Sequence, residues 1–134
     1  MTFSEKYGPW ALITGASEGT GAEFARQLAE QGIHCILIGR RDGPLRELAA
    51  EIRGRGVECV AASVDLTSDT AAEAIIAAAG NREVGLLITN AGADTNGSMF
   101  LDNDIANWEA LVTMNVPTTM RLVLHFGQGM RARG

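Results

Sequence analysis

The sequence predicts an α/β protein built on a doubly wound parallel sheet. Short apolar or β-branched runs alternate with longer amphipathic stretches along the 134 residues, and one expected strand is apolar throughout, as a strand covered on both faces should be. No internal repeat, low-complexity tract or interdomain linker interrupts the alternation. Because successive strand–helix units build a parallel sheet, we expect a single domain over residues 1–134.

The first strand–helix unit is expected directly after the turn-forming pair Gly8-Pro9. Residues 10–14 form the strand, and a helix follows over residues 19–31. Apolar side chains at three- and four-residue spacing predict that helix, namely Phe24, Ala25, Leu28 and Ala29. Gly32 ends the helix, since a glycine commonly stands just past a helix end.

The three later units repeat this order. Their strands are expected over residues 35–38, 57–62 and 84–89, and their helices over residues 44–53, 68–79 and 105–130. Pro44 suits the first turn of the second helix, and Thr67 or Ser68 caps the third. Pro117 removes a backbone donor from the last helix and is expected to kink it. We expect one stripe of this helix to lie in the core, formed by Val112, Val116, Val123 and Met130.

Right-handed crossovers predict the strand order 3-2-1-4 for this sheet. The fourth strand then lies at an edge, and its run from Leu86 to Thr89 is long and apolar for an exposed edge. We therefore expect further strands, or a partner, to cover that edge. We expect the sheet to be incomplete at this edge, as in the N-terminal part of a longer domain.

Charge and composition argue against several classes of protein. Eleven lysines and arginines against sixteen aspartates and glutamates leave a net charge of −5, which disfavours a nucleic-acid binder with its basic face. No apolar run is long enough to span a bilayer, and the first residues lack the features of a signal peptide. Cys35 and Cys59 cannot form a disulfide framework, and His34 and His125 lack metal-ligand spacing. We expect a cytoplasmic protein without a metal site and without nucleic-acid or membrane partners.

A glycine-rich turn connects the first strand to the first helix. It reads Thr14-Gly15-Ala16-Ser17-Glu18-Gly19-Thr20-Gly21. Gly15 permits the sharp turn out of the strand, and Gly19 and Gly21 allow a ligand and the sheet to come close. The free N–H groups of the following helix favour a phosphate, and Ser17 and Thr20 add donors. Because crevices in such sheets lie at the carboxyl ends of the strands, this position favours a phosphate cradle over a purely structural turn.

The spacing of the turn is neither that of a P-loop nor the G-x-G-x-x-G of most NAD-binding folds. TGASEGTG at residues 14–21 resembles the TGxxxGxG turn of the short-chain dehydrogenase/reductase family. The resemblance continues in register along nearly the whole chain, through Gly39-Arg40-Arg41, Asp65-Leu66, Asn90-Ala91-Gly92 and Asn115. The opening YGPWALITGAS is similar to the ketoacyl/hydroxysteroid reductase branch. This resemblance implies a Rossmann-type fold that binds a nicotinamide cofactor.

The residues after the second expected strand select the cofactor. An acid there would bond both ribose hydroxyls and favour NAD, whereas an arginine accommodates the 2′-phosphate of NADP. Arg40 and Arg41 precede the first acid, Asp42, and a planar guanidinium suits a phosphate dianion. We therefore expect NADP(H) rather than NAD(H), with Glu18 as a departure, because many NADP-preferring relatives have a basic residue at that place. The alternative is that both arginines are solvated and pair with Asp42 or Glu47.

The resemblance implies a cofactor site formed by Gly15, Ser17, Glu18, Gly19, Thr20, Gly21, Arg40, Arg41, Asp65, Leu66, Asn90, Ala91 and Gly92. In such a site Asp65 would bond the adenine amino group, and Leu66 would pack on the ring. Asn90 would brace the central strands, and Gly92 would keep room for the cofactor. The alternatives are a turn or capping carboxylate before Thr67 for Asp65, and an ordinary strand-to-loop turn for the segment that begins at Asn90.

In this family a hydride passes between the nicotinamide and a carbonyl or alcohol carbon, with a tyrosine, a lysine four residues later, a serine and an asparagine at the site. The resemblance places one of these here, Asn115, as the residue that positions a proton-relay water. Its alternative is a helix residue that faces solvent. The only lysine and the only tyrosine are Lys6 and Tyr7, so the 134 residues contain no Tyr-x-x-x-Lys. We expect them, by themselves, to be inactive in hydride transfer.

Three interpretations of function follow. The first is the cofactor-binding half of an NADP(H)-dependent oxidoreductase that acts on a small carbonyl compound or secondary alcohol. The second is a non-catalytic regulator that binds NADP(H). The third, a SAM-dependent methyltransferase, is disfavoured because that site also needs an acid at the end of the second strand. By resemblance, the outer face of the last helix, with Trp108 as an anchor, is a candidate contact in a homo-oligomer.

Overall fold

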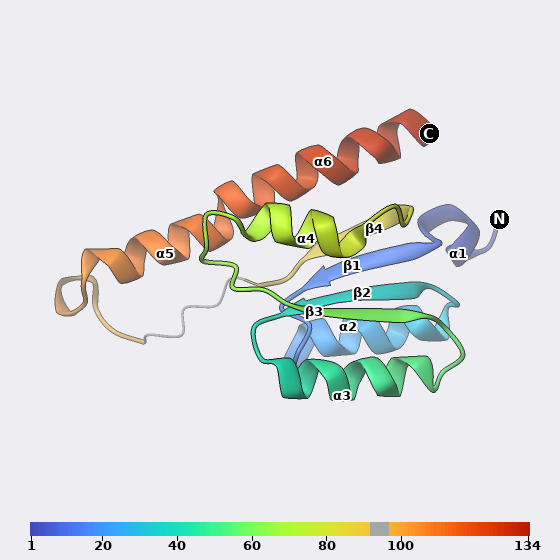
Figure 1. Cartoon of the computed structure of the whole chain (residues 1–134), viewed down its shortest axis with the longest axis horizontal. Helices are drawn as coiled ribbons and strands as arrows, with labels where there is room; N and C mark the ends of the chain where they lie inside the picture. Colours follow the sequence, from blue (N-terminus) through green and yellow to red (C-terminus); the bar gives the residue numbers. More distant parts are fainter. Residues whose placement is uncertain (92–96) are drawn as a thin grey trace.

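A parallel sheet forms the centre of the protein. The computed structural model describes residues 1–91 and 97–134 (Figure 1). The strands are β1 (Trp10–Thr14), β2 (His34–Gly39), β3 (Cys59–Ser63) and β4 (Val84–Thr89). All pairings are parallel, and the order β3-β2-β1-β4 confirms the predicted topology.

Helices cover both faces of this sheet (Figure 1). One face packs against α2 (Gly19–Glu30) and α3 (Asp42–Arg53), and the other packs against α4 (Ala71–Ala79) and α6 (Pro117–Arg133). Three further elements complete the described chain, namely α1 (Phe3–Tyr7), the 3-10 helix η1 (Phe100–Asp102) and α5 (Ile105–Asn115). This arrangement is the doubly wound α/β fold that the alternating pattern predicted.

Successive side chains of the central strands enter two different cores. Ala11 and Ile13 of β1 are fully buried on the side of α2 and α3, whereas Leu12 between them is buried on the side of α4 and α6. In β2, Leu37 and Ile36 divide in the same way. Because both faces are covered, these strands need apolar residues at every position, which explains their unbroken apolar sequence.

The two cysteines are core residues of neighbouring strands. Cys35 of β2 and Cys59 of β3 are partners in the strand register, and both thiols are buried. Burial raises the pKa of Cys35 to about 12 and that of Cys59 to about 11. Since the thiolate is the reactive form of cysteine, both side chains stay protonated and unreactive at neutral pH.

The single helix expected over residues 105–130 is wrong. The structure has two helices, α5 and α6, with a break at Val116, whose φ is −112° and ψ −75°. Pro117 is the first residue of α6. A proline has no N–H and its ring clashes with the preceding turn, so it is readily accommodated only in the first turn of a helix. The expected kink is therefore a complete break.

The break also changes which face of the last helix is buried. The expected core stripe is wrong, because Val112, Val116 and Val123 are 57%, 49% and 51% exposed. Thr118, Leu122 and Phe126, spaced four residues apart, are the buried side chains of α6. Met130 does pack against the same core. Since α6 starts anew at Pro117, the apolar periodicity cannot be extrapolated into it from α5.

Hydrogen bonds in the β3–α4 connection shift the start of α4. The helix begins at Ala71 rather than at residue 68, and neither expected cap is used. The hydroxyl of Thr67 donates to Asp65 at 2.6 Å, and the Ser68 Oγ accepts from the N–H of Thr70 at 3.3 Å. These local bonds stabilise turns in place of the first helical turn.

The short helix α1 was not among the elements that the sequence pattern predicted. Thr2 and Glu5 form a capping box, in which the Thr2 hydroxyl accepts from the Glu5 N–H and the Glu5 carboxylate accepts from the Thr2 N–H. The helix packs on β4 at Gly85, where the register with β1 shifts. A Cβ at Gly85 would collide with the backbone of Tyr7 and Gly8. Only a glycine there allows the chain to come this close.

An arginine covers the outer edge of β3. The guanidinium of Arg53, at the end of α3, donates to the Cys59 carbonyl from Nε at 3.1 Å and from Nη2 at 2.8 Å. The preceding carbonyl, that of Glu58, pairs with β2, so the Cys59 carbonyl faces away from the sheet. Unpaired edge carbonyls attract other chains, and a cation on the edge blocks such pairing.

We expect Arg53→Met to lower the free energy of unfolding by about 1–2 kcal/mol, because the carbonyl loses a charged donor. We also expect more self-association through β3. Urea denaturation and analytical ultracentrifugation measure the two effects. Arg46→Met is the matched control, since Arg46 lies on the same helix and its only ion pair among the described residues is the exposed one with Asp42. Equal behaviour of the two variants would show that water replaces the Arg53 guanidinium without loss.

Candidate functional site

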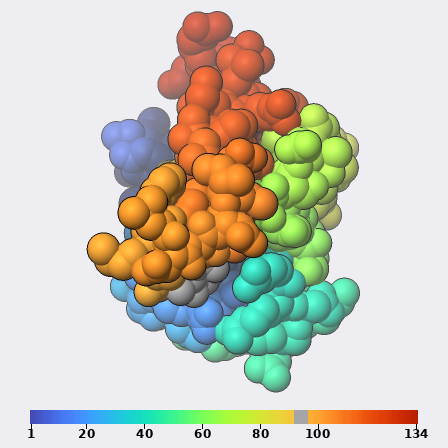
Figure 2. Space-filling model, turned by 90° about the vertical axis from the view of Figure 1, so that its left-hand side faces the viewer, coloured from blue at the N-terminus to red at the C-terminus, as the bar shows by residue number. Residues whose placement is uncertain are grey.

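The residues that follow the four strands lie at the carboxyl end of the sheet. β1 leads into residues 15–21, β2 into Arg40-Arg41, β3 into residues 64–66 and β4 into Asn90-Ala91. Figure 2 faces this end of the molecule, with α5 in orange and the start of α3 in cyan. Gly92, also expected in the site, lies outside the described residues. The parallel sheet thus brings together segments that are far apart in the sequence.

Two glycines let the first turn pass close to the end of β4. Gly15 has a φ of +64°, and a Cβ there would lie 3.0 Å from the Cα of Ala91. A Cβ at Gly21 would collide with the Gly15 carbonyl oxygen and lie 2.8 Å from Nδ2 of Asn90. Both glycines are therefore required by the packing of the chain on itself.

Gly19 stands in a different environment. Its φ is +62°, and no heavy atom of the described chain lies within 4 Å of the place where a Cβ would stand. Glu18 directly precedes α2, and in residues 1–91 and 97–134 no side chain caps the first turn of this helix. An uncapped helix start beside open space suits an anionic ligand, because the free N–H groups and the helix dipole both favour negative charge.

Polar groups lock the ends of β1 and β4 together. Thr14 is buried, with 3% of its surface exposed. Its hydroxyl accepts from the N–H groups of Asn90 at 3.1 Å and Ala91 at 3.3 Å. Nδ2 of Asn90 donates to the Gly15 carbonyl at 3.2 Å. The glycine turn is thus held against β4. Thr14 was not among the expected site residues, although a threonine at the end of an apolar strand was the available signal.

Arg41 forms an ion pair across two turns. Its Nη2 lies 2.5 Å from Oε2 of Glu18, and both side chains are more than half exposed. The alternative pairing of Arg41 with Asp42 is not found in the described structure, where Asp42 pairs with Arg46 at 2.7 Å. The pair therefore joins the β1–α2 turn to the β2–α3 turn.

Arg40 and Asp65 follow neighbouring strands. The Ser63 hydroxyl donates to the Arg40 carbonyl at 2.8 Å. Oδ1 of Asp65 accepts from the Thr67 hydroxyl at 2.6 Å and from its N–H at 3.0 Å. These bonds, with a smaller contribution from the charge of Arg40, hold the pKa of Asp65 below its usual value. Asp65 is thus an ionised carboxylate held in its turn by Thr67, and it stays a candidate acceptor for a ligand at this end of the sheet.

Leu66 ties the same turn to α6. Its side chain is buried in the core between the sheet, α4 and α6. Its carbonyl accepts from the hydroxyl of Thr118 at 3.3 Å, and Arg121 donates to the Asp69 carbonyl at 3.0 Å. The β3–α4 connection is therefore anchored at two points along α6.

Three further expected residues take up separate positions. Ser17 is half-buried beside β2, since a Cβ at Gly39 would lie 3.3 Å from the Ser17 Cβ. Thr20 is exposed in the first turn of α2. Asn115 is exposed at the end of α5, where Nδ2 donates to the Leu111 carbonyl at 2.8 Å. No hydrogen bond within the described part of the chain connects Asn115 to the glycine turn.

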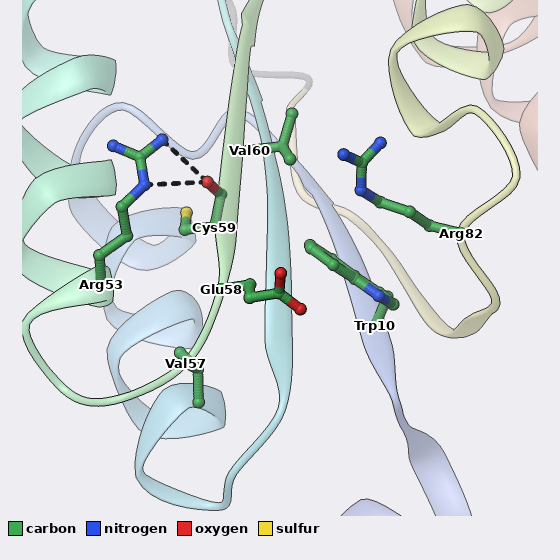
Figure 3. A pocket seen from close by; sticks show the side chains of 7 residues that line it. All are labelled: Trp10, Arg53, Val57, Glu58, Cys59, Val60 and Arg82. Atoms are coloured by element: carbon green, nitrogen blue, oxygen red, sulfur yellow. Dashed lines mark hydrogen bonds between the residues drawn. The ribbon is translucent and has the colours of Figure 1, made fainter.

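A separate hollow of about 290 Å³ lies at the opposite end of the sheet (Figure 3). Trp10 and Cys59, which line it, are the first residues of β1 and β3. The two arginines that line the hollow already have partners. Arg53 donates to the Cys59 carbonyl, and the guanidinium carbon of Arg82 lies 5.1 Å from the centroid of the Trp10 ring. Ligand crevices in open α/β sheets lie at the carboxyl ends of the strands. The carboxyl end is therefore the candidate functional site.

The described residues offer neither a metal site nor a membrane-spanning helix. Residues 1–91 and 97–134 contain no group of three or more histidine, cysteine, aspartate or glutamate side chains that could hold a metal ion. Among the helices described, none combines the length and the apolar character needed to cross a membrane. The glycine turn and the arginines after β2 remain the candidate site.

Sequence comparison identifies relatives of this chain. The family model described as short chain dehydrogenase matches residues 9–134. A 7beta-hydroxysteroid dehydrogenase of Mediterraneibacter gnavus is 32% identical over 127 residues, which are 94% of this chain and 48% of that protein. A very-long-chain 3-oxoacyl-CoA reductase of Laccaria bicolor is 33% identical over an alignment of 138 positions, which covers 98% of this chain and 41% of that protein. The chain spans about half the length of the curated relatives it matches.

Solved structures share the fold. A structure from a study of 7beta-hydroxysteroid dehydrogenase stereoselectivity superposes with a TM-score of 0.92 at 34% identity, over 99% of this chain and 51% of that chain. The L-sorbose reductase of Gluconobacter frateurii, complexed with NADPH and L-sorbose, gives 0.85 at 28% identity, over 96% and 50%. The chain therefore belongs to the short-chain dehydrogenase/reductase family of oxidoreductases, in its ketoacyl/hydroxysteroid reductase-like branch.

Proposed function

We propose that this chain is the NADP(H)-binding part of an oxidoreductase that transfers a hydride between a nicotinamide and a carbonyl or secondary alcohol. The observation that supports this most directly is the start of α2, where Gly19 leaves open space beside an uncapped helix N-terminus at the carboxyl end of β1. The similarity to L-sorbose reductase, whose structure contains NADPH, supports the choice of cofactor.

The residues present fit such a cofactor. The start of α2, with Ser17 and Thr20, would hold the pyrophosphate, because free N–H groups and the helix dipole favour anions. Arg40 and Arg41 would hold the 2′-phosphate by charge-assisted hydrogen bonds. Asp65 would accept from the adenine amino group, and the segment from Asn90 to Gly92 would line the nicotinamide side. The cofactor, when bound, supplies or accepts the hydride.

Asn115 is proposed as the residue that positions a proton-relay water. Its Nδ2 donates to the Leu111 carbonyl, which orients the amide and leaves Oδ1 to accept from a water molecule. The chain's one lysine and one tyrosine, Lys6 and Tyr7, are adjacent, so no Tyr-x-x-x-Lys pair exists within the 134 residues. We therefore propose that these residues bind the cofactor but do not by themselves catalyse turnover.

Gly19→Ala tests the proposed cofactor site. We expect the affinity for NADPH, measured by calorimetry, to fall about tenfold or more, because the new Cβ occupies the space next to the helix start and strains a left-handed backbone. Gly32→Ala is the matched control. Gly32 also has a positive φ, +81°, and open space around it, but it stands at the other end of α2. Both substitutions therefore introduce comparable backbone strain.

The two variants and two cofactors give distinct outcomes. Equal affinities of Gly19→Ala and Gly32→Ala for NADPH would refute a cofactor site at the start of α2. Tighter binding of NADPH than of NADH by the unchanged chain is expected, and the reverse order would refute the cofactor preference while leaving the site in place. Binding of S-adenosylmethionine in place of either nucleotide would refute the oxidoreductase assignment for this site.

A further inference from the structure

We propose that Glu18 is a specificity-determining residue that acts as an internal counter-ion for Arg41 and opposes the binding of a 2′-phosphate there. The inference rests on the proposed function, since it takes the residues after β2 as the site of the adenosine ribose. The contact that supports it is the ion pair between Oε2 of Glu18 and Nη2 of Arg41.

The position of Glu18 gives it another partner that it does not use. Glu18 directly precedes α2, as Arg41 directly precedes α3. The helix dipole favours an acid at this place, and a carboxylate there can also accept from first-turn N–H groups. In the described structure the Glu18 carboxylate makes no such bond and extends to Arg41 in the neighbouring turn. The Glu18 carboxylate is therefore engaged by the Arg41 guanidinium and not by the helix start.

A 2′-phosphate on Arg41 would have to compete with this carboxylate. Arg–phosphate recognition is strongest when two parallel N–H groups of the guanidinium donate together. Glu18 already accepts from Nη2, so a phosphate must either displace the carboxylate or lie beside a second negative charge. A ribose hydroxyl carries no charge and meets neither penalty. Glu18 therefore reduces the preference for NADP(H) over NAD(H) without abolishing it.

Arg40 meets less competition than Arg41, since the charge of Asp65 interacts with it but the two side chains form no ion pair in the described structure. Its carbonyl is held by the Ser63 hydroxyl at 2.8 Å, and within residues 1–91 and 97–134 its guanidinium forms no ion pair. A 2′-phosphate can thus bind Arg40 while Arg41 stays paired with Glu18. Glu18 therefore modulates one of two phosphate-binding arginines, and its effect on affinity is a moderate factor.

Glu18→Gln removes the charge and keeps the shape and hydrogen-bonding capacity of the side chain. We expect this variant to bind NADPH about fivefold more tightly, the upper range for one exposed charge pair, and NADH within about twofold of the unchanged chain. 2′,5′-ADP, which has the 2′-phosphate but no nicotinamide, should show the same gain. Because the charges are exposed, the gain should shrink at high salt.

Glu30→Gln is the matched control. Glu30 also lies at an end of α2 and pairs with an arginine, since its Oε1 is 2.8 Å from Nη1 of Arg55. The substitution removes the same charge and the same kind of ion pair at the far end of the helix. It should leave the affinities for NADPH, NADH and 2′,5′-ADP within about twofold, so a gain shared by both variants would overturn the inference.

The remaining outcomes separate this inference from the function on which it rests. An unchanged NADPH-to-NADH ratio in Glu18→Gln, with both nucleotides bound, would overturn the role of Glu18 and leave the cofactor site intact. Weaker NADPH binding by the variant would show that Glu18 positions Arg41 for the phosphate, which also overturns it. Failure of the unchanged chain and of both variants to bind any of the nucleotides would overturn the proposed function, and this inference with it.

Discussion

Gly21→Ala is expected to lower the free energy of unfolding by about 2–3 kcal/mol, the range for forcing an extra methyl group into a packed site. The added Cβ would collide with the Gly15 carbonyl oxygen and lie 2.8 Å from Nδ2 of Asn90. The first of these is a backbone atom at the end of β1, so it cannot move without displacing the strand. Urea denaturation followed by circular dichroism measures the loss.

The same variant is expected to lose affinity for NADPH by about tenfold or more, since relief of the collision shifts the whole glycine turn. Binding is measured by calorimetry at a temperature where the variant remains folded. Gly127→Ala is the matched control, because no described heavy atom lies within 4 Å of the Cβ it would add in α6. It should stabilise the protein by about 0.5–1 kcal/mol, as alanine does in a helix interior. If the free energy of unfolding changed in the same direction in both variants, the packing role of Gly21 would be contradicted.

Thr14→Val is expected to have the next largest effect, a loss of about 2 kcal/mol, because two backbone N–H groups lose their acceptor. Valine nearly matches threonine in shape, so the change isolates the hydroxyl, which accepts from Asn90 and Ala91. Thr14→Ser is the control that keeps this acceptor and removes only a methyl group. Its loss should be clearly smaller in the same urea titration. Equal losses would assign the effect to the methyl group and refute the locking of β1 to β4 by the Thr14 hydroxyl.

The variants at positions 19 and 21 distinguish two functions of glycine in one turn. Gly15 and Gly21 are needed because the chain packs against itself at the end of β4. Gly19 is needed, on the proposed function, because a ligand occupies the space beside it. Substitution at position 21 should therefore change both stability and binding, whereas Gly19→Ala should differ from its control Gly32→Ala in binding only.

The last two helices show where a local pattern stops being informative. Apolar spacing within residues 105–130 predicted a helix, and the described structure is helical through most of that range. The buried face was nevertheless wrong, since Val112 and Val123 are exposed and Leu122 is buried. A helical pattern keeps its phase only while the helix is continuous, and Pro117 interrupts it. Which side of α6 meets the sheet then depends on how the second helix docks.

The partner of Arg41 illustrates the same limit at the site. Its charge and its place after β2 were evident from the sequence, and the neighbouring acids Asp42 and Glu47 were the partners considered. The structure pairs it with Glu18, 23 residues away. The two residues meet because β1 and β2 are adjacent parallel strands, so the turns that follow these strands lie side by side.

The sequence by itself determined the alternation of strands and helices, the strand order, the place of the glycine turn and the resemblance to a family. These features follow from local periodicity, from the handedness of crossovers and from short motifs, all of which are contained in neighbouring residues. Only the tertiary structure decided which glycines are fixed by packing, which acid holds Arg41, which hydroxyl locks β1 to β4 and which face of α6 is buried. The reason is physical: each depends on contacts between segments that are remote in the chain, and such contacts exist only once the sheet has brought those segments together.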